Sequence, residues 1–449
     1  MRRGAILVLL AAAAPLEARA AARARDGGTL RLAVLPEVRA DRWGETPEGA
    51  ALRELVAAPL CRVEGGGRVQ PVLASVQRTA DGVSVVPRPG ARFSSGAPLG
   101  TAELAQAWAR AVERSPVARA ALGPVRELAP TLEQQSRGKA AGLLLPLAHP
   151  WPDLEVSLCH PALAPVLGDG GSDGVGPYAP DGAERGRAVP AFPEGRPHPD
   201  GFLVSTLARR AAQRALETRS AQVLLGDGGE AAAPALFATY LVSRPQARPM
   251  VSLLETRLDR PALVRSFVGS PAAAMPGLLP PSLGGPERSA SAGGSPGRGS
   301  GTALLLYAAD RPGQRAVAQR LQILLRDAGV SLRLGARTPE ALDRDWRAGQ
   351  GDLALRSVLL PPVPAAALAV VLELAGDPGA GRRELAGLGA LADERERAAR
   401  TRERALQLAG ALPVVPLYVE GLRARLDPAL VDVRRDAFGL WTLDDAWWP

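Results

Sequence analysis

The sequence is poor in several residue types. Its 449 residues contain no Asn, two Ile, a single Lys and only 4% aromatic residues, whereas Gly reaches 49 and Pro 42. With 46% hydrophobic residues, this profile excludes collagen, a coiled coil and a mainly disordered chain. The enrichment in Ala, Arg, Gly, Leu and Pro is typical of a GC-rich genome, and the shortage of aromatic rings argues against sugar stacking. The length predicts two or three domain-sized units, because single cores stop growing at about 250 to 300 residues.

Cysteine and histidine are also scarce. The chain has only Cys61 and Cys159, and its histidines are His149, His160 and His198. In an oxidising compartment the two cysteines can form a disulfide, and two buried free thiols are the alternative. A zinc site would have to use Cys159 and His160, which are adjacent and lack the usual spacing of structural zinc ligands. We therefore predict no metal and no cofactor.

The positive charge is spread along the chain. The formal net charge is +8, but the basic residues, nearly all of them Arg, are interleaved with 46 Asp and Glu. Proteins that bind nucleic acid more often gather their positive charge into one stripe or tail. The charge pattern therefore predicts no nucleic-acid partner.

The amino terminus has the pattern of a secretory signal peptide. Arg2 and Arg3 precede the apolar run 4–15, and the small residues of 18–20 offer a cleavage site. The run is too short for a membrane anchor, since spanning takes about 20 apolar residues. No Cys follows the run, so a lipid anchor is not expected. We predict a signal peptide over residues 1–20 and export to the periplasm.

Motifs that would indicate catalysis are incomplete. Residues 293–297 match the G-x-S-x-G turn of hydrolases, but they lie in a low-complexity stretch, and no His follows His198. Residues 136–139 match S-x-x-K, but the later K-T-G triad needs a second Lys, which the chain lacks. The Gly- and Asp-rich run 168–174 lacks the Glu that a Ca²⁺ loop requires. The chain is not expected to be an enzyme.

The hydrophobic pattern indicates mixed strands and helices from the start of the chain. Alternation predicts strands over 28–34 and 83–86, and helical periodicity predicts helices over 48–60 and from 101 to 114. Strands and helices that alternate in this way favour an α/β fold.

The second half of the chain repeats this mixture. A flexible loop is expected at 285–301, followed by a strand at 302–307, a helix at 314–328 and a strand at 330–334. This unit argues for a parallel or mixed sheet covered by helices. The apolar run 363–375 is too short to span a membrane and predicts a buried helix.

Six short blocks of the sequence are informative together. They are residues 27–31, 69–74, 86–99, 174–178, 258–264 and 412–418, and the helix at 101–114 follows the third. In kind and in order they resemble blocks of the family 5 extracellular solute-binding proteins, the dipeptide, oligopeptide and nickel receptors of ABC importers. Residues 86–99 resemble the family pattern L-R-P-G-v-x-F-x-D-G-x-P-L. The blocks cover nearly the whole mature chain, which is identified as a divergent member of this family.

The resemblance implies an α/β, two-lobed periplasmic binding protein fold (type II, cluster C-like) with an extra subdomain in lobe I. The implied division gives lobe I residues 21–45, 165–245 and 428–449, the subdomain 46–164 and lobe II 246–427, with the chain crossing between lobes near Tyr240 to Arg248. The lobes would close on a ligand about a hinge.

The substrate signature departs from the family's. In peptide-binding members the strand D-L-A-L leads to a Trp and then to an Asp that pairs with the peptide ammonium group, but Val358 and Pro361 stand there in this chain. An unpaired ammonium group in a closed cleft is costly, so an ordinary free-amino peptide is not expected unless another carboxylate substitutes. Arg356 is either a partner for a carboxylate or phosphate or an exposed surface residue. The predicted ligand-binding residues are Trp43, Arg356, Ser357, Val358 and Pro361.

Together these features predict the periplasmic substrate-binding component of an ABC importer. It would be a monomer that captures a small-molecule or peptide-like solute by hinge closure and delivers it to a permease in the inner membrane. The alternative is a divergent homologue that no longer transports and acts as an interaction or sensory partner.

Overall fold

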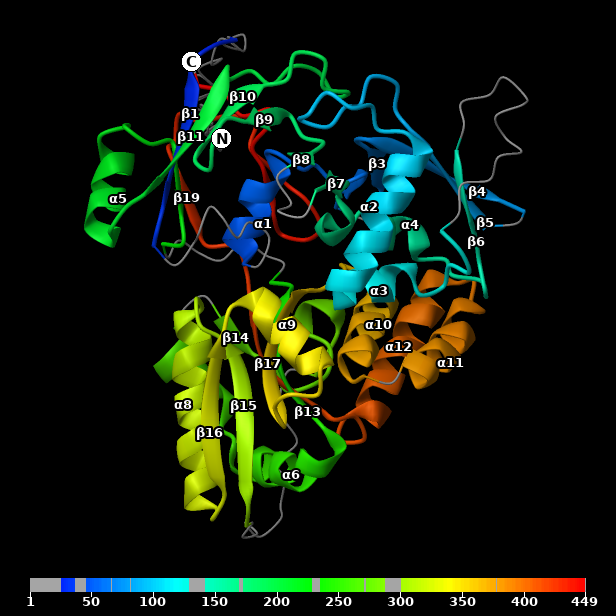
Figure 1. The fold of residues 1–449 in the computed structure, drawn as a ribbon, viewed down its shortest axis with the longest axis vertical. Helices are drawn as coiled ribbons and strands as arrows, with labels where there is room; N and C mark the ends of the chain where they lie inside the picture. Colours follow the sequence, from blue (N-terminus) through cyan, green and yellow to red (C-terminus); the bar gives the residue numbers. More distant parts are fainter. Residues whose placement is uncertain are drawn as a thin grey trace, which may run out of the picture.

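Two six-stranded sheets organise the described part of the chain (Figure 1). The computed structural model describes residues 26–36, 46–65, 67–80, 82–128, 142–168, 173–227, 235–269, 272–286, 300–376 and 378–448. The predicted signal peptide, Trp43, the S-x-x-K match, the G-x-S-x-G match and most of the 285–301 loop lie outside these residues.

The first sheet is built around the strand nearest the amino terminus. β1 (Thr29–Val34) pairs in parallel with β11 on one side and with β12 on the other. The remaining strands are antiparallel to their neighbours. The order is β19 (Ala424–Leu426), β12 (Val223–Leu225), β1, β11 (Gly201–Thr206), β10 (Arg185–Ala188) and β9 (Tyr178–Pro180). Helix α5 (Arg209–Glu217) packs on β1 and β12.

The second sheet is mixed. Its order is β14 (Ala272–Ala274), β18 (Val414–Glu420), β13 (Phe237–Ser243), β17 (Leu353–Leu359), β15 (Thr302–Ala308) and β16 (Ser331–Arg337). β15 pairs in parallel with both β16 and β17, whereas β13 is antiparallel to both of its neighbours. Every residue of β13 is buried, as expected for a central strand covered on both faces.

Helices cover both faces of the second sheet. α6 (Arg248–Arg257) and α8 (Pro312–Asp327) share a core with it, while α9 (Pro339–Arg347) packs on β15 and β16. The predicted strand, helix and strand of 302–334 are confirmed as β15, α8 and β16. α10 (Pro364–Leu374) is the predicted buried helix; α11 (Pro378–Gly389) and α12 (Glu394–Leu408) follow it. Across the described residues, every helix is too short or too polar to cross a membrane.

A third group of elements lies between α1 (Pro47–Glu54) and β7 (Val166–Leu167) in the sequence. It contains the predicted helix α2 (Thr101–Arg114), whose Trp108 is fully buried and donates a hydrogen bond to the Leu163 carbonyl at 3.0 Å. The cysteines form a disulfide, Cys61–Cys159, which decides between the two alternatives left open by the sequence. The other elements are β2 (Cys61–Val63), β3 (Val69–Pro71), β4 (Ala74–Thr79), β5 (Gly82–Pro87), α3 (Pro116–Leu122), β6 (Leu143–Pro146) and α4 (Leu154–Leu158).

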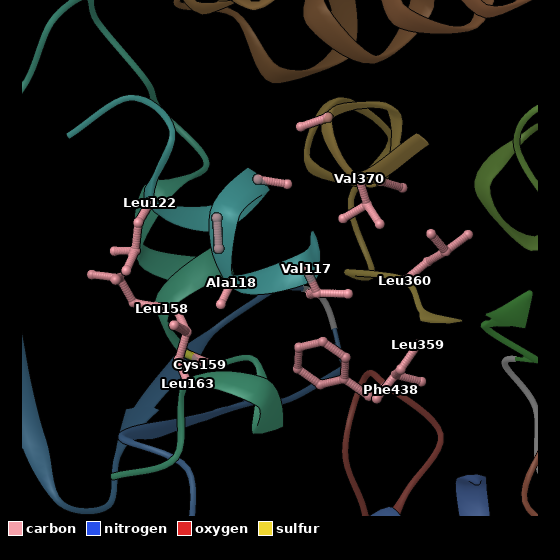
Figure 2. Packing of buried hydrophobic residues seen from close by; sticks show 14 of the residues in the cluster. Val117, Ala118, Leu122, Leu158, Cys159, Leu163, Leu359, Leu360, Val370 and Phe438 are labelled. Atoms are coloured by element: carbon pink, nitrogen blue, oxygen red, sulfur yellow. The ribbon is translucent and has the colours of Figure 1, made fainter. Parts of the chain in front are cut away.

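This subdomain shares one hydrophobic core with the helices of lobe II. Figure 2 shows Val117 of α3 on the side of α10, the helix that carries Val370. Leu360, which follows β17, and Phe438 of the carboxyl-terminal segment belong to the same buried cluster. The subdomain is therefore in contact with both lobes.

Pairing in the sheets corrects the predicted boundaries. The predicted lobe I extends to residue 245 and therefore includes β13. In the structure, however, β13 pairs with β17 and β18 in the second sheet. The chain therefore crosses to lobe II before Phe237. It returns before β19, earlier than the predicted residue 427, because β19 pairs with β12 in the first sheet.

The predicted helix 48–60 is shorter than expected. It forms as α1 (Pro47–Glu54), begins at the capping side chain of Thr46 and ends before the turn at 55–57. Leu52 and Leu55 belong to the core of the first sheet, so α1 packs with lobe I and not with the subdomain to which residues 46–164 were assigned.

Candidate ligand-binding site

A cavity of about 410 Å³ lies between the two sheets, and both lobes contribute to its wall. It is located beyond the carboxyl ends of β12 and β15, the position where open α/β sheets usually bind ligands. Lobe I contributes Thr46, Pro47, Glu48, Arg209 and Gly226; the second sheet and its helices contribute Phe237, Phe267, Val268, Asp310, Arg311, Gly313, Gln314, Ala316, Ser357, Tyr418 and Glu420, followed by Gly421 and Arg423.

One wall of the cavity carries a fixed polar network. The Gln314 side chain accepts a hydrogen bond from the Ala308 backbone at 2.9 Å and donates one to Ser357 Oγ at 2.7 Å. Ser357 Oγ is also 2.7 Å from the hydroxyl of Thr239. Burial raises the pKa of the neighbouring Tyr418, which hydrogen bonds to Thr239, so its phenol stays protonated. The network presents hydroxyl and amide groups that are held in place before any ligand arrives.

The charged side chains of the cavity differ in their partners. Arg209 forms an ion pair with Asp227, and Arg423 Nη2 lies 2.5 Å from Glu420 Oε1. Glu48 accepts a hydrogen bond from the Arg423 backbone at 3.2 Å. Burial raises the pKa of both Glu48 and Glu420.

Arg311 stands apart from these groups. Its guanidinium carbon lies 5.1 Å from the centre of the Phe237 ring, and its Nε is buried without a hydrogen-bond partner. Within the described residues, the Arg311 side chain forms no hydrogen bond and no ion pair. Arg311 precedes the first turn of α8 as its N-cap residue.

Another part of the cavity wall is apolar. A π-helix, Val264–Val268, ends at Gly269, whose φ of +82° favours glycine. Such i→i+5 turns often occur at functional sites, because they rotate the following side chains relative to a regular helix. Here Phe267 and Val268 line the cavity, and Phe267 remains 37% exposed. The cavity therefore combines an apolar wall with convergent polar groups, as small-molecule sites usually do.

Two of the predicted site residues, Arg356 and Ser357, are neighbours on β17 and point to opposite faces of the sheet. Ser357 lines the cavity, but Arg356 is its neighbour on β17 and points to the other face of the sheet. There Arg356 Nη2 pairs with Asp343 Oδ1 of α9 at 2.6 Å, and the Arg356 side chain is 10% exposed. Arg356 thus does not line this cavity, and its low exposure corrects the interpretation of it as an exposed surface residue.

Two further predicted residues, Val358 and Pro361, are also outside the cavity wall. Val358 is buried in the core shared with the subdomain, and Pro361 is buried after the end of β17. Sequence reasoning missed Arg311 and Gln314, although a signal was present. Both lie in the junction between the predicted strand 302–307 and the body of the helix at 314–328, at the carboxyl end of a parallel strand.

No protein-family model matches the sequence, and no curated protein matches it either. Solved structures do match. The murein tripeptide binding protein MppA of Escherichia coli superposes with a TM-score of 0.71 at 16% identity, covering 94% of this chain and 98% of that chain. The periplasmic binding protein DppA from Helicobacter pylori, in complex with the peptide STSA, gives a TM-score of 0.69 at 15% identity, with coverages of 94% and 98%. The chain has the two-lobed periplasmic binding protein fold.

A second MppA structure also matches. This structure, described as the unliganded open form, gives a TM-score of 0.56 at 14% identity and covers 94% of this chain and 97% of that chain. The chain is therefore less similar to this open form than to the first MppA structure.

Proposed function

We propose that this chain is the periplasmic substrate-binding component of an ABC importer. It captures a small or peptide-like solute between its lobes and delivers the solute to a permease in the inner membrane. The observation that carries this proposal is the cavity of about 410 Å³, whose wall is formed by both lobes. A ligand that contacts both lobes stabilises the closed arrangement, which is how such proteins signal occupancy.

The chemistry of the cavity supports a solute other than an ordinary free-amino peptide. Val358 and Pro361, which replace the aromatic and acidic residues of the peptide binders, do not line the cavity. Glu420 pairs with the guanidinium of Arg423, and Glu48 accepts a hydrogen bond from the Arg423 backbone. A peptide ammonium group would have to compete with these donors.

The disulfide Cys61–Cys159 supports the proposed location, because disulfides persist in oxidising compartments such as the periplasm. We propose that the exported protein begins after the predicted signal peptide at residue 20 and acts as a monomer. Names of the similar structures describe binding proteins, in agreement with a non-catalytic role.

Blocking the cavity tests the proposal. A Cβ added at Gly313, which lines the cavity, meets no atom within 4 Å, so Gly313→Trp projects an indole into the site without a backbone clash. The matched control is Gly387→Trp on α11, where a Cβ also meets no atom within 4 Å. Protein purified from its native periplasm should carry one small solute by native mass spectrometry. Gly313→Trp should lose that solute and Gly387→Trp should retain it.

Two outcomes would contradict the proposed function. If the wild-type protein carries no solute, and no peptide or metabolite in a library raises its melting temperature, the transport proposal is wrong. If Gly313→Trp retains the solute with unchanged affinity, the solute binds elsewhere on the protein.

A further inference from the structure

We infer that the cavity binds a small organic anion, with its anionic group on Arg311 and its apolar part against Phe237 and Phe267. The inference rests on the proposed function and adds the chemical class of the ligand. It replaces the anion site that the sequence assigned to Arg356, whose guanidinium is occupied by Asp343 on the other face of β17.

The first argument is the state of Arg311. Its Nε is buried without a hydrogen-bond partner, and a desolvated donor left unpaired is unfavourable. The other two cavity cations are satisfied, Arg209 by Asp227 and Arg423 by Glu420. Arg311 is therefore the guanidinium in this cavity that has donors to offer to a ligand.

The acidic groups of the cavity do not take this role. Glu420 is near enough to interact electrostatically with Arg311, but its short ion pair is with Arg423. Glu48 accepts from the Arg423 backbone and belongs to lobe I. Asp310, the residue before Arg311, also lines the cavity.

The local backbone favours an anion at the same place. α8 has 16 residues, begins with Pro312 and has no side-chain cap. Gly313, Gln314 and Ala316 of its first turns line the cavity. The positive end of the helix dipole therefore adds to the charge of Arg311.

The aromatic residues indicate what the anion is attached to. The Arg311 guanidinium lies over the face of Phe237, an arrangement that leaves the N–H edge free for a two-oxygen acceptor. Phe267 and Val268 extend the apolar wall. A carboxylate or phosphonate on an aromatic or branched aliphatic body meets both features at once.

Matched probes test this class. Phenylacetate and benzylphosphonate are the anions, and phenylacetamide is the neutral analogue of the first. By isothermal titration calorimetry on the wild-type protein, we expect an anion to bind at least about 10-fold more tightly than phenylacetamide, the scale of a hydrogen bond to a charged group. The preferred anion distinguishes a carboxylate from a phosphonate ligand.

Two variants locate the contact. Arg311→Gln should weaken the better anion at least about 10-fold, with Arg311→Lys between it and wild type because a Lys cannot bind in a bidentate way. Arg315→Gln, an exposed residue one turn along α8, is the control and should leave affinity unchanged. Circular dichroism and the melting temperature verify that each variant is folded.

Several outcomes would overturn the inference. It is wrong if phenylacetamide binds as tightly as the anions, if neither anion binds, or if a folded Arg311→Gln protein keeps its affinity. A neutral or cationic solute that co-purifies and is lost in Gly313→Trp would refute the anion inference while leaving the proposed function standing. Failure of the proposed function shows itself separately, as the absence of any solute.

Discussion

Asp436 is a buried carboxyl that holds a turn near the carboxyl terminus. Its Oδ1 accepts hydrogen bonds from the backbones of Phe438 and Leu440 at 3.0 and 2.9 Å. Burial raises the pKa of Asp436 to about 7. Nearby, both carboxyl oxygens of Glu54 are buried without hydrogen-bond partners, and burial raises its pKa as well. Arg62, the cation of this region, pairs with Asp444 and Glu194 instead.

This environment predicts a pH-dependent contribution to stability. Because the pKa of Asp436 is higher in the folded state than in the unfolded state, its contribution is complete below the ordinary value near 3.8 and is lost as the pH rises through about 7. Asp436→Asn keeps an acceptor oxygen and cannot ionise. We therefore expect the variant to gain stability relative to wild type from pH 5.5 to about 7, by at most about 1.4 kcal/mol per pH unit, and the difference to level off above that pH.

Urea unfolding at several pH values measures this difference. The exposed Asp327, changed to Asn, is the control and should follow the wild-type curve. Parallel curves for wild type and Asp436→Asn would show that Asp436 is already ionised in the folded protein at pH 5.5.

Arg356 gives a second prediction at the residue scale. Its partner Asp343 also pairs with Arg347 at 2.6 Å, so Arg356→Met leaves that carboxylate with a remaining cation. We expect a loss of about 1–3 kcal/mol in the free energy of unfolding, the usual effect of removing a hydrogen bond to a charged group, and no change in the affinity for phenylacetate. If Arg356→Met changed the affinity for phenylacetate and left the free energy of unfolding unchanged, Arg356 would be a ligand-binding residue after all.

Among the elements, the disulfide connects β2 to the end of α4. It joins residues separated by 98 positions, and both cysteines are buried. Constraining a loop of this length in the unfolded chain stabilises the folded state by up to about 4–5 kcal/mol. We expect reduction to lower the melting temperature of the wild-type protein. The double variant Cys61→Ala/Cys159→Ala should melt at that lower temperature with or without reductant; equal melting of all samples would contradict a structural role.

Elements with a strong local pattern were predictable, and relations between distant elements were not. The unit β15–α8–β16 follows from periodicity, because the apolar residues of α8 recur on one face whatever surrounds them. Nothing local in the sequence of β13 indicates that its partners are β17 and β18. Likewise, alternation along β17 places Arg356 and Ser357 on opposite faces, but only the folded chain shows which face meets the cavity.

At the scale of the whole molecule, the two lobes are connected by the subdomain as well as by the two chain segments that cross between them. On the lobe II side of the subdomain, Arg397 of α12 makes a bidentate pair with Asp153 at 3.1 and 2.7 Å, and both side chains are buried. His160 Nε2 lies 3.0 Å from the Leu359 carbonyl, while its Nδ1 accepts from Ala162. Burial lowers the pKa of His160 to about 4, so the ring is neutral and donates through Nε2.

The same subdomain also contacts lobe I through polar interactions. Arg62 of β2 pairs with Asp444 at 2.7 Å, and the backbone of Ala58 donates to Val175. Separating the lobes therefore requires breaking one of these two interfaces in addition to bending the crossings. If the interface between the subdomain and lobe II separated, the apolar side chains that pack α3 on α10 (Figure 2) would be exposed to water, which is unfavourable.

This arrangement predicts that the protein stays mainly closed without a ligand, so that a ligand selects a closed state that already exists. The radius of gyration from small-angle X-ray scattering should change little when solute is removed. Asp153→Asn/Arg397→Gln takes away the buried pair with little change of shape and should enlarge the ligand-free protein, which solute then compacts. Arg400→Gln, in an exposed pair with Glu403 on the same helix, should behave as wild type. A ligand-free wild-type protein that is extended and contracts on binding would show that the subdomain does not hold the lobes together.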